Sequence, residues 1–223
     1  MTKQPKRTEI LEGLLHFQYP NQRELAATFL RPQEHYESSE FKGKIFTLDE
    51  FKKWYVQNYP EAVKAGGKFT YYEDWDGFNI PGYIFNPFFE GKFNPLSKRE
   101  KTLLGMLEYR KSEKFYTIGT FENGDPTDVT HEISHGLFYL DPDYKRKVIE
   151  VVRNLGVQDN KRLHQYLSDN CYNPEVFDDE MQAYLLATLK YLEQEEGVKI
   201  TPGMKLASAK LNEIYTKLLK TRK

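Results

Sequence analysis

Two histidines one helical turn apart give this chain its clearest capacity for chemistry. His131 and His135 flank Glu132 in the run His-Glu-Ile-Ser-His. Residues four apart on a helix project from the same face, so both imidazoles can bind one metal ion at about 2.0 to 2.1 Å each. Glu132 can then reach a water on that ion without being a ligand itself. Its carboxylate would take the proton of a water whose pKa the ion has already lowered toward about 7.

A helix is predicted for Asp125–Leu140, the segment that contains these residues. Asp125 can cap its N-terminus, Pro126 suits its first position, and Asp141 with Pro142 ends it. The face opposite the histidines is apolar and is expected to pack on the core, which directs the histidines toward a cleft. That apolar face consists of Val129, Ile133, Leu137 and Leu140.

A second segment, further along the chain, makes the motif resemble the metal site of a known superfamily. The run Asp178–Ala187 (DDEMQAYLLA) is similar to the second-helix pattern of gluzincin metallopeptidases, particularly the ExxA and apolar run of ImmA/IrrE-like proteases. The resemblance covers the two helices. It implies a zincin fold, one zinc ion per chain and Glu180 as the third ligand beside His131 and His135. These families often carry Asn or Asp where this chain has Tyr184, so a partner that orients the ligands must come from elsewhere.

Two further carboxylates compete with Glu180 for the ligand role. Asp179 is its neighbour but points about 100° away on an ideal helix, so only one of the two can face the histidines well. Glu175 follows Pro174 at the start of the predicted helix, where the helix dipole already explains a carboxylate. We therefore rank Glu180 first, Asp179 second and Glu175 third. A solvated acidic helix start would explain all three without a metal.

The composition predicts a soluble, cytoplasmic protein of ordinary domain size. The 223 residues suit one domain, and the net charge of −1 provides no field that would attract nucleic acid or a membrane. The single Cys171 cannot form an intramolecular disulfide and excludes a Cys-rich zinc cage, so any metal must use His and carboxylates. No stretch approaches about 18 uninterrupted apolar residues. We expect neither nucleic acid nor a membrane among the partners.

The predicted fold class is α+β and mostly helical, with a zincin-like motif helix beside a small sheet. We expect a single zincin-like domain over residues 1–223, in four parts: an N-terminal helical layer (1–65), a strand and loop region (66–124), the metal-site helices (125–196) and a C-terminal docking helix (197–223). Capping boxes are expected at Thr47 with Glu50 and at Ser97 with Glu100. Besides the motif helix, the predicted helices are Asn21–Leu30, Leu48–Tyr59, Ser97–Tyr109, Asp143–Leu155, Asn160–Ser168, Pro174–Glu196 and Pro202–Leu219.

One strand and one loop complete the prediction. Lys114–Phe121 is rich in β-branched and aromatic residues, which favours a strand. In zincins a strand beside the motif helix lets an extended peptide pair along its edge, and Phe115–Phe121 is the candidate for that edge. The alternative is a purely structural strand, and the two interpretations are compatible. The loop Asp74–Phe89 is dense in aromatic residues. We interpret it either as a lid over a substrate or as a segment that packs on the core.

These features together predict a zinc metallopeptidase that acts on a protein or peptide. Glu132 is expected to be the general base, and Tyr184 the phenol that donates to the oxyanion. One alternative is a zincin-fold protein that no longer cleaves and instead binds or regulates a partner. Another is a metal-dependent hydrolase of a non-peptide substrate. The presence of Glu132 argues against a purely structural metal, because such a site has no use for a general base.

Overall fold

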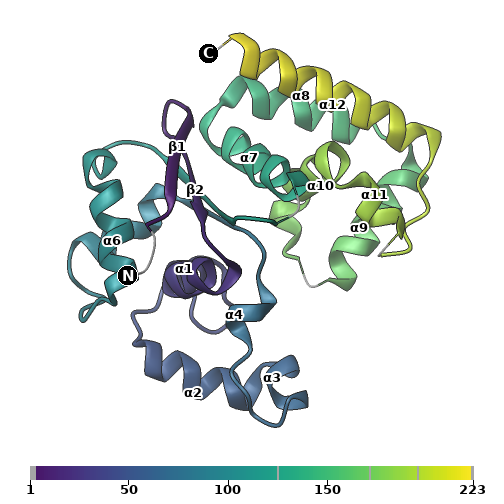
Figure 1. The fold of residues 1–223 in the computed structure, drawn as a ribbon. Helices are drawn as coiled ribbons and strands as arrows, with labels where there is room; N and C mark the ends of the chain where they lie inside the picture. The colour runs from purple at the N-terminus through teal and green to yellow at the C-terminus, as the bar shows by residue number, and fades with distance from the viewer. Residues whose placement is uncertain (1–3, 125, 171, 195, 222–223) are drawn as a thin grey trace. The chain divides into compact units, whose positions relative to one another are not determined.

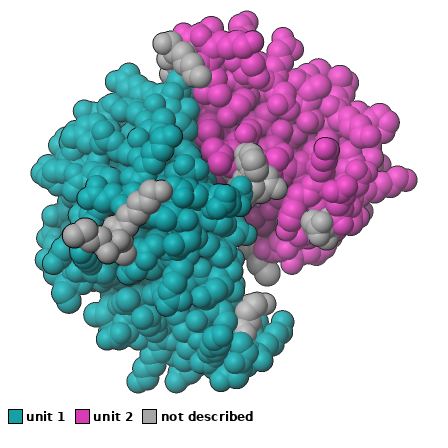
Figure 2. Space-filling view, in the orientation of Figure 1, with its two compact units in different colours: residues 1–124 teal, residues 125–223 magenta. Residues whose placement is uncertain are grey.

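The computed structural model describes residues 4–124, 126–170, 172–194 and 196–221, and it divides after Gly124 into two units, residues 1–124 and 125–223 (Figures 1 and 2). The predicted α+β, mostly helical class is confirmed, because most residues lie in helices and the strands form one small sheet. The division falls where the metal-site helices were expected to begin, and the single zincin-like domain stays a prediction. The expected N-cap Asp125 and the lone Cys171 lie outside the described residues.

The first unit is built on a four-stranded sheet of order β1-β2-β4-β3. The strands are β1 (Lys6–Leu11), β2 (Leu14–Tyr19), β3 (Phe78–Pro81) and β4 (Tyr116–Phe121). β1 and β2 form an antiparallel hairpin, β2 runs parallel to β4, and β3 runs antiparallel to β4. The parallel pair requires a long crossover, and all the helices of this unit lie within it.

This strand order corrects two predictions. The N-terminal layer is not purely helical, because residues 6–19 form a hairpin that the sequence analysis missed. The predicted strand exists as β4, but the expectation that it offers a free edge to a peptide is wrong. β4 pairs with β2 over residues 116–121 on one side and with β3 over residues 116–119 on the other, so it is an interior strand of the sheet.

The helices of the first unit begin largely where the capping signals placed them. Thr47 and Glu50 form a reciprocal capping box at the start of α2, and Ser97 and Glu100 do the same for α6. α1 extends beyond the predicted end and continues through Pro32. The helical segments are α1 (Gln22–Glu37), α2 (Leu48–Asn58), α3 (Pro60–Lys64), α4 (Tyr71–Asp74), η1 (Gly82–Phe85), α5 (Asn86–Phe89), α6 (Lys98–Leu107) and η2 (Glu108–Arg110).

An aromatic core joins α1 to one face of this sheet. Gly119 of β4 permits the contact, because a Cβ at this position would lie 2.7 Å from Leu25 and 2.8 Å from Phe29. Segment 74–89 belongs mostly to the same core rather than to a lid: Phe78, Phe85 and Phe88 are at most 2 % exposed. Packing on the core was one of the two interpretations of this loop, and the structure supports it.

A buried ion pair ties α1 to α6. Arg31 donates from Nε to Oε1 of Glu100 and from a terminal nitrogen to Oε2, both at 2.6 Å, with the two side chains 5 % and 6 % exposed. Another Arg31 nitrogen donates to the carbonyl of Phe93 at 2.9 Å, and Glu100 also accepts from the backbone N–H of Ser97 at 2.7 Å. The charges are therefore matched in number and geometry.

Every regular element in the described part of the second unit is a helix. α10 lies at its centre and packs against α7, α8, α9 and α12 (Figure 1). Asp141 ends α7 as predicted and also caps α8, accepting hydrogen bonds from the backbone of Asp143 and Tyr144. The helical segments of the second unit are α7 (Pro126–Leu140), α8 (Pro142–Arg153), α9 (Val157–Asp169), η3 (Pro174–Val176), α10 (Phe177–Ala187), α11 (Leu189–Gln194) and α12 (Pro202–Thr221).

The long helix predicted for Pro174–Glu196 is interrupted, which corrects a third prediction. It consists of η3, α10 and α11, and the break between the last two falls at Thr188, whose φ of −123° and ψ of 29° leave the helical region. Gly197, the expected terminator, has a φ of 65°. No helix in the described part of the chain is both long enough and apolar enough to span a bilayer.

Candidate metal centre

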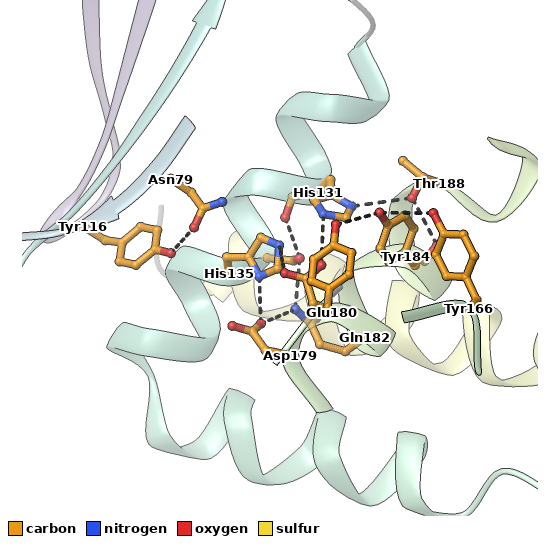
Figure 3. A network of polar contacts seen from close by, with 12 residues as sticks. Asn79, Tyr116, His131, His135, Tyr166, Asp179, Glu180, Gln182, Tyr184 and Thr188 are labelled. Carbon is orange, nitrogen blue, oxygen red and sulfur yellow. Dashed lines mark hydrogen bonds and ion pairs between the residues drawn. The ribbon is translucent and has the colours of Figure 1, made fainter. Parts of the chain in front are cut away.

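Helices α7 and α10 bring together the three residues that were ranked first as metal ligands. Nε2 of His131 and Nε2 of His135 each lie 3.9 Å from a carboxylate oxygen of Glu180. The two imidazole rings are 4.8 Å apart between centroids. Figure 3 shows these side chains converging between the two helices. His135 is almost completely buried, whereas His131 and Glu180 each retain 15 % side-chain exposure. Two of the three side chains are therefore partly accessible to solvent.

The second nitrogen of each ring has a partner of its own. Nδ1 of His135 lies 2.9 Å from Oδ1 of Asp179, and Nδ1 of His131 lies 3.5 Å from the Thr188 hydroxyl. A ring that donates from Nδ1 keeps the Nε2 lone pair for a metal. Both histidines thus present the same nitrogen, Nε2, toward Glu180. This shared orientation is compatible with both rings binding one ion.

The electrostatics of the two histidines differ. Burial, helped by the neighbouring His135, holds the pKa of His131 well below its usual 6.5, so this ring is neutral. Burial also opposes protonation of His135, but the carboxylates of Asp179 and Glu180 outweigh it and raise its pKa to about 10. A ligating nitrogen must lose its proton, and metal binding therefore releases that proton. The surrounding negative charge that holds a proton on His135 is equally suited to hold a cation.

The spacing of the three ligand atoms fits a metal ion. Ligands on a tetrahedral zinc ion lie about 3.4 Å apart when each bond is about 2.0 to 2.2 Å long. One ligand atom from each of His131, His135 and Glu180 lies within 4.8 Å of the others. A closure of about 1.4 Å or less, within reach of small side-chain rotations, therefore brings them to bonding distance. Two histidines and one glutamate are also the donor set of known catalytic zinc sites.

The other two candidate carboxylates have different positions. Asp179 contacts the far nitrogen of His135 rather than the shared centre, so it occupies the place of the orienting partner that was expected from elsewhere in the chain. Glu175 lies exposed in η3, where its backbone N–H donates to Asn173 and the cap accounts for the acidic residue. His164, the remaining histidine of this unit, is exposed on α9 and stacks edge-on against Phe177.

Tyr184 lies beside the cluster, but other phenols engage its hydroxyl group. Its ring meets His131 edge-on, with the centroids 5.0 Å apart. Its hydroxyl accepts a hydrogen bond from Tyr166 at 3.4 Å and shares another with Tyr172 at 3.0 Å. Burial raises the pKa of all three phenols above the usual 10, so each keeps its proton. Tyr166 and Tyr172 were not predicted from the sequence to lie at this position.

Glu132 is partly exposed on α7, directly after His131. Its charge contributes to the raised pKa of His135, which places the carboxylate within electrostatic reach of the cluster. Glu132, Asp179 and Glu180 together surround the two rings with more negative charge than His135 alone can balance. A divalent cation would neutralise that excess.

Three buried polar residues under the cluster were also missed. They are Ser134 on α7, Tyr144 on α8 and Gln182 on α10, and hydrogen bonds connect them. One signal was available in the sequence: Gln182 lies between the apolar residues Met181 and Ala183, and Ser134 follows Ile133 and precedes Leu137 by three positions. Buried polar groups of this kind require partners, although the sequence does not reveal which ones.

No known protein family, curated protein or solved structure matches this chain. The likeness to gluzincin peptidases therefore rests on the residues of α7 and α10.

Proposed function

We propose that this protein is a zinc-dependent metallopeptidase in which His131, His135 and Glu180 hold one zinc ion. The observation that carries the proposal is the shared orientation of the two histidines: each presents Nε2 to Glu180, while its Nδ1 faces another partner. A bound zinc ion would lower the pKa of a water and polarise the scissile carbonyl. The proposed compartment is the cytoplasm, in keeping with the single cysteine.

The roles of the chain's own residues follow from their positions. Glu132, partly exposed and next to a ligand, would accept the proton of the attacking water and pass it to the leaving amine. The phenol of Tyr184, protonated and beside His131, would donate toward the developing oxyanion. Asp179 would keep His135 in the orientation that ligation needs. The proposed substrate is a protein or peptide.

The test combines metal analysis with one conservative substitution. The purified chain, dialysed against zinc, is expected to retain about one ion per molecule, since three ligands converge on one point. Glu132→Gln keeps the ligands and removes the base. It should hold the same amount of zinc while its turnover of a mixed peptide library, followed by mass spectrometry, falls about 10²- to 10⁴-fold. Glu150→Gln on the exposed face of α8 is the matched control and should leave both quantities unchanged.

Two outcomes would contradict the proposal. A chain that retains no zinc has no metal centre of this kind. A Glu132→Gln variant that cleaves as fast as the original chain has no general base at this position, even if zinc is bound.

A further inference from the structure

The amide of Gln182 is completely buried near the candidate metal centre, as is Ser134, to which it is hydrogen-bonded. Gln182 is 0 % exposed and lies on α10, one turn after Asp179. Nε2 donates to Oδ1 of Asp179 at 3.1 Å and to the hydroxyl of Ser134 at 3.0 Å. Oε1 accepts from the hydroxyl of Tyr144 at 2.9 Å. One side chain thus joins α7, α8 and α10.

The directions of these hydrogen bonds are fixed by their partners. The Ser134 hydroxyl donates its only proton to the carbonyl of His131 at 2.6 Å, so it can only accept from Gln182. Oδ1 of Asp179 likewise accepts from this amide. Both protons of the Gln182 amide are therefore committed, and turning the amide over would place its oxygen against Asp179. The side chain has one orientation that satisfies all of its neighbours.

Asp179 consequently receives two donors on the same oxygen. Nδ1 of His135 reaches Oδ1 at 2.9 Å, and Nε2 of Gln182 reaches it at 3.1 Å. Without the second donor, the carboxylate could turn toward solvent, because 24 % of the Asp179 side chain is exposed. Gln182 holds it against the ring. The orientation of His135 in turn decides whether Nε2 points at Glu180.

We propose that Gln182 is a positioning residue that sets the affinity of the centre for a divalent cation, acting through Asp179 on His135. The inference rests on the proposed metal centre and adds a residue that touches neither the ion nor a substrate. Losing a partner in the second layer around a metal typically costs about 10- to 100-fold in affinity. Because Gln182 is one step further from the ion than Asp179, its effect should lie at the lower end of that range.

The experiment measures the zinc affinity of the full chain by competition with a chelator, at a temperature where every variant is folded. Gln182→Met fills the same space without polar atoms and is expected to bind zinc about tenfold more weakly. Tyr144→Phe is the matched control, since it removes a hydrogen bond from the opposite side of the same amide. It should lower the melting temperature while changing zinc affinity less than about threefold.

A double-mutant cycle separates positioning from general loosening of the core. In an Asp179→Ala background, His135 has already lost its carboxylate, so Gln182→Met should weaken zinc binding no further. If Gln182→Met instead reduces affinity by the same factor in both backgrounds, the residue acts through the core and the inference is overturned. Unchanged affinity in Gln182→Met alone overturns it as well.

A second variant guards against misfolding of the first. Gln182→Glu keeps the shape and the acceptor for Tyr144, but it replaces the donor to Asp179 with an oxygen. It is expected to weaken zinc binding at least as much as Gln182→Met does, and affinity equal to that of the original chain would again refute the inference. If the original chain binds no zinc, the proposed function itself fails. If it binds zinc and both Gln182 variants match it, only the positioning role fails.

Discussion

The two units handle buried carboxylates in different ways. In the first unit, Glu100 receives two hydrogen bonds from Arg31 at 2.6 Å and one from a backbone N–H, so its charge is matched. In the second unit, Glu180 lies 3.9 Å from each of two imidazole nitrogens, beyond hydrogen-bond distance from either. The first arrangement is complete as it stands. In the second, one ligand atom from each of His131, His135 and Glu180 lies within 4.8 Å of the others, so the three residues could hold a metal ion.

A third carboxylate extends the comparison. Glu34 on α1 is 8 % exposed and contacts the hydroxyl groups of Tyr71 and Ser38. Burial raises its pKa to about 7, so it responds to its surroundings by taking up a proton. Glu100 pairs with the guanidinium of Arg31, Glu34 binds a proton, and Glu180 is proposed to bind a metal ion. A buried acid is thus informative about function only after its partners have been identified.

Breaking the completed pair should have the largest effect. Arg31→Met leaves Glu100 buried without its cation, which typically costs about 3 to 5 kcal/mol of unfolding free energy. Urea unfolding followed by tryptophan fluorescence measures this, because Trp54 and Trp75 both pack against the core of the first unit. Arg23→Met is the control: its pair with Glu73 is exposed and should be worth less than about 1 kcal/mol. A similar loss of unfolding free energy in both variants would mean that the buried pair stabilises the chain no more than the exposed pair does.

Zinc binding to His131, His135 and Glu180 should have the next largest effect. At a free zinc concentration of about 100 times Kd, binding stabilises the native state by about 2.7 kcal/mol. Hydrogen exchange should therefore slow in α7 and α10, the helices that carry the ligands. Glu180→Ala should abolish the zinc-dependent slowing. Asp178→Asn should retain it, since Asp178 pairs with Arg153 instead. Equal slowing in both variants would remove Glu180 from the ligand set.

The protonated carboxylate gives the smallest effect, and it depends on pH. The pKa of Glu34 is about 7 in the folded chain and about 4.5 when unperturbed, so the folded state binds the proton more tightly. The resulting stabilisation is complete below about pH 4.5 and is lost as the pH rises through 7. Glu34→Gln should show no such loss. The stability difference between the original chain and this variant should shift by about 2.6 kcal/mol between pH 4.5 and pH 7.

The control for this measurement is Glu40→Gln, at an exposed glutamate that pairs with Lys44. The stability difference between this variant and the original chain should stay nearly constant over the same pH interval. A flat difference for Glu34→Gln would mean that Glu34 has an ordinary pKa.

Local signals made several elements predictable from the sequence. The capping boxes at Thr47 and Ser97 depend on residues three positions apart, and both were found where expected. The motif helix was predicted for the same reason, since its histidines and its end at Asp141 are close in sequence. Local signals alone do not show which of the three candidate acidic residues faces the histidines. The phase of α10 relative to α7 decides which carboxylate faces the histidines, and only the packed structure supplies it.

The missed features depend on partners that are distant in sequence. β1 carries four exposed residues in a row, so it lacks the alternation that would identify a strand, and it forms only by pairing with β2. Thr188 ends α10 without a proline or glycine to signal the break. The contacts of Gln182 with Ser134 and Tyr144 bridge three helices. Spacing along one helix cannot reveal such contacts.

The strand order also determines where this sheet could pair with a strand of another molecule. A sheet recruits a strand from another molecule only at its edges, and here those edges are β1 and β3. β1 presents exposed Lys6, Arg7 and Glu9, whose charges discourage a second copy from aligning there. β3 is four residues long and includes Pro81, which has no amide hydrogen to donate. Because β2 and β4 lie inside the sheet, neither of them is an edge at which a strand of another molecule could pair.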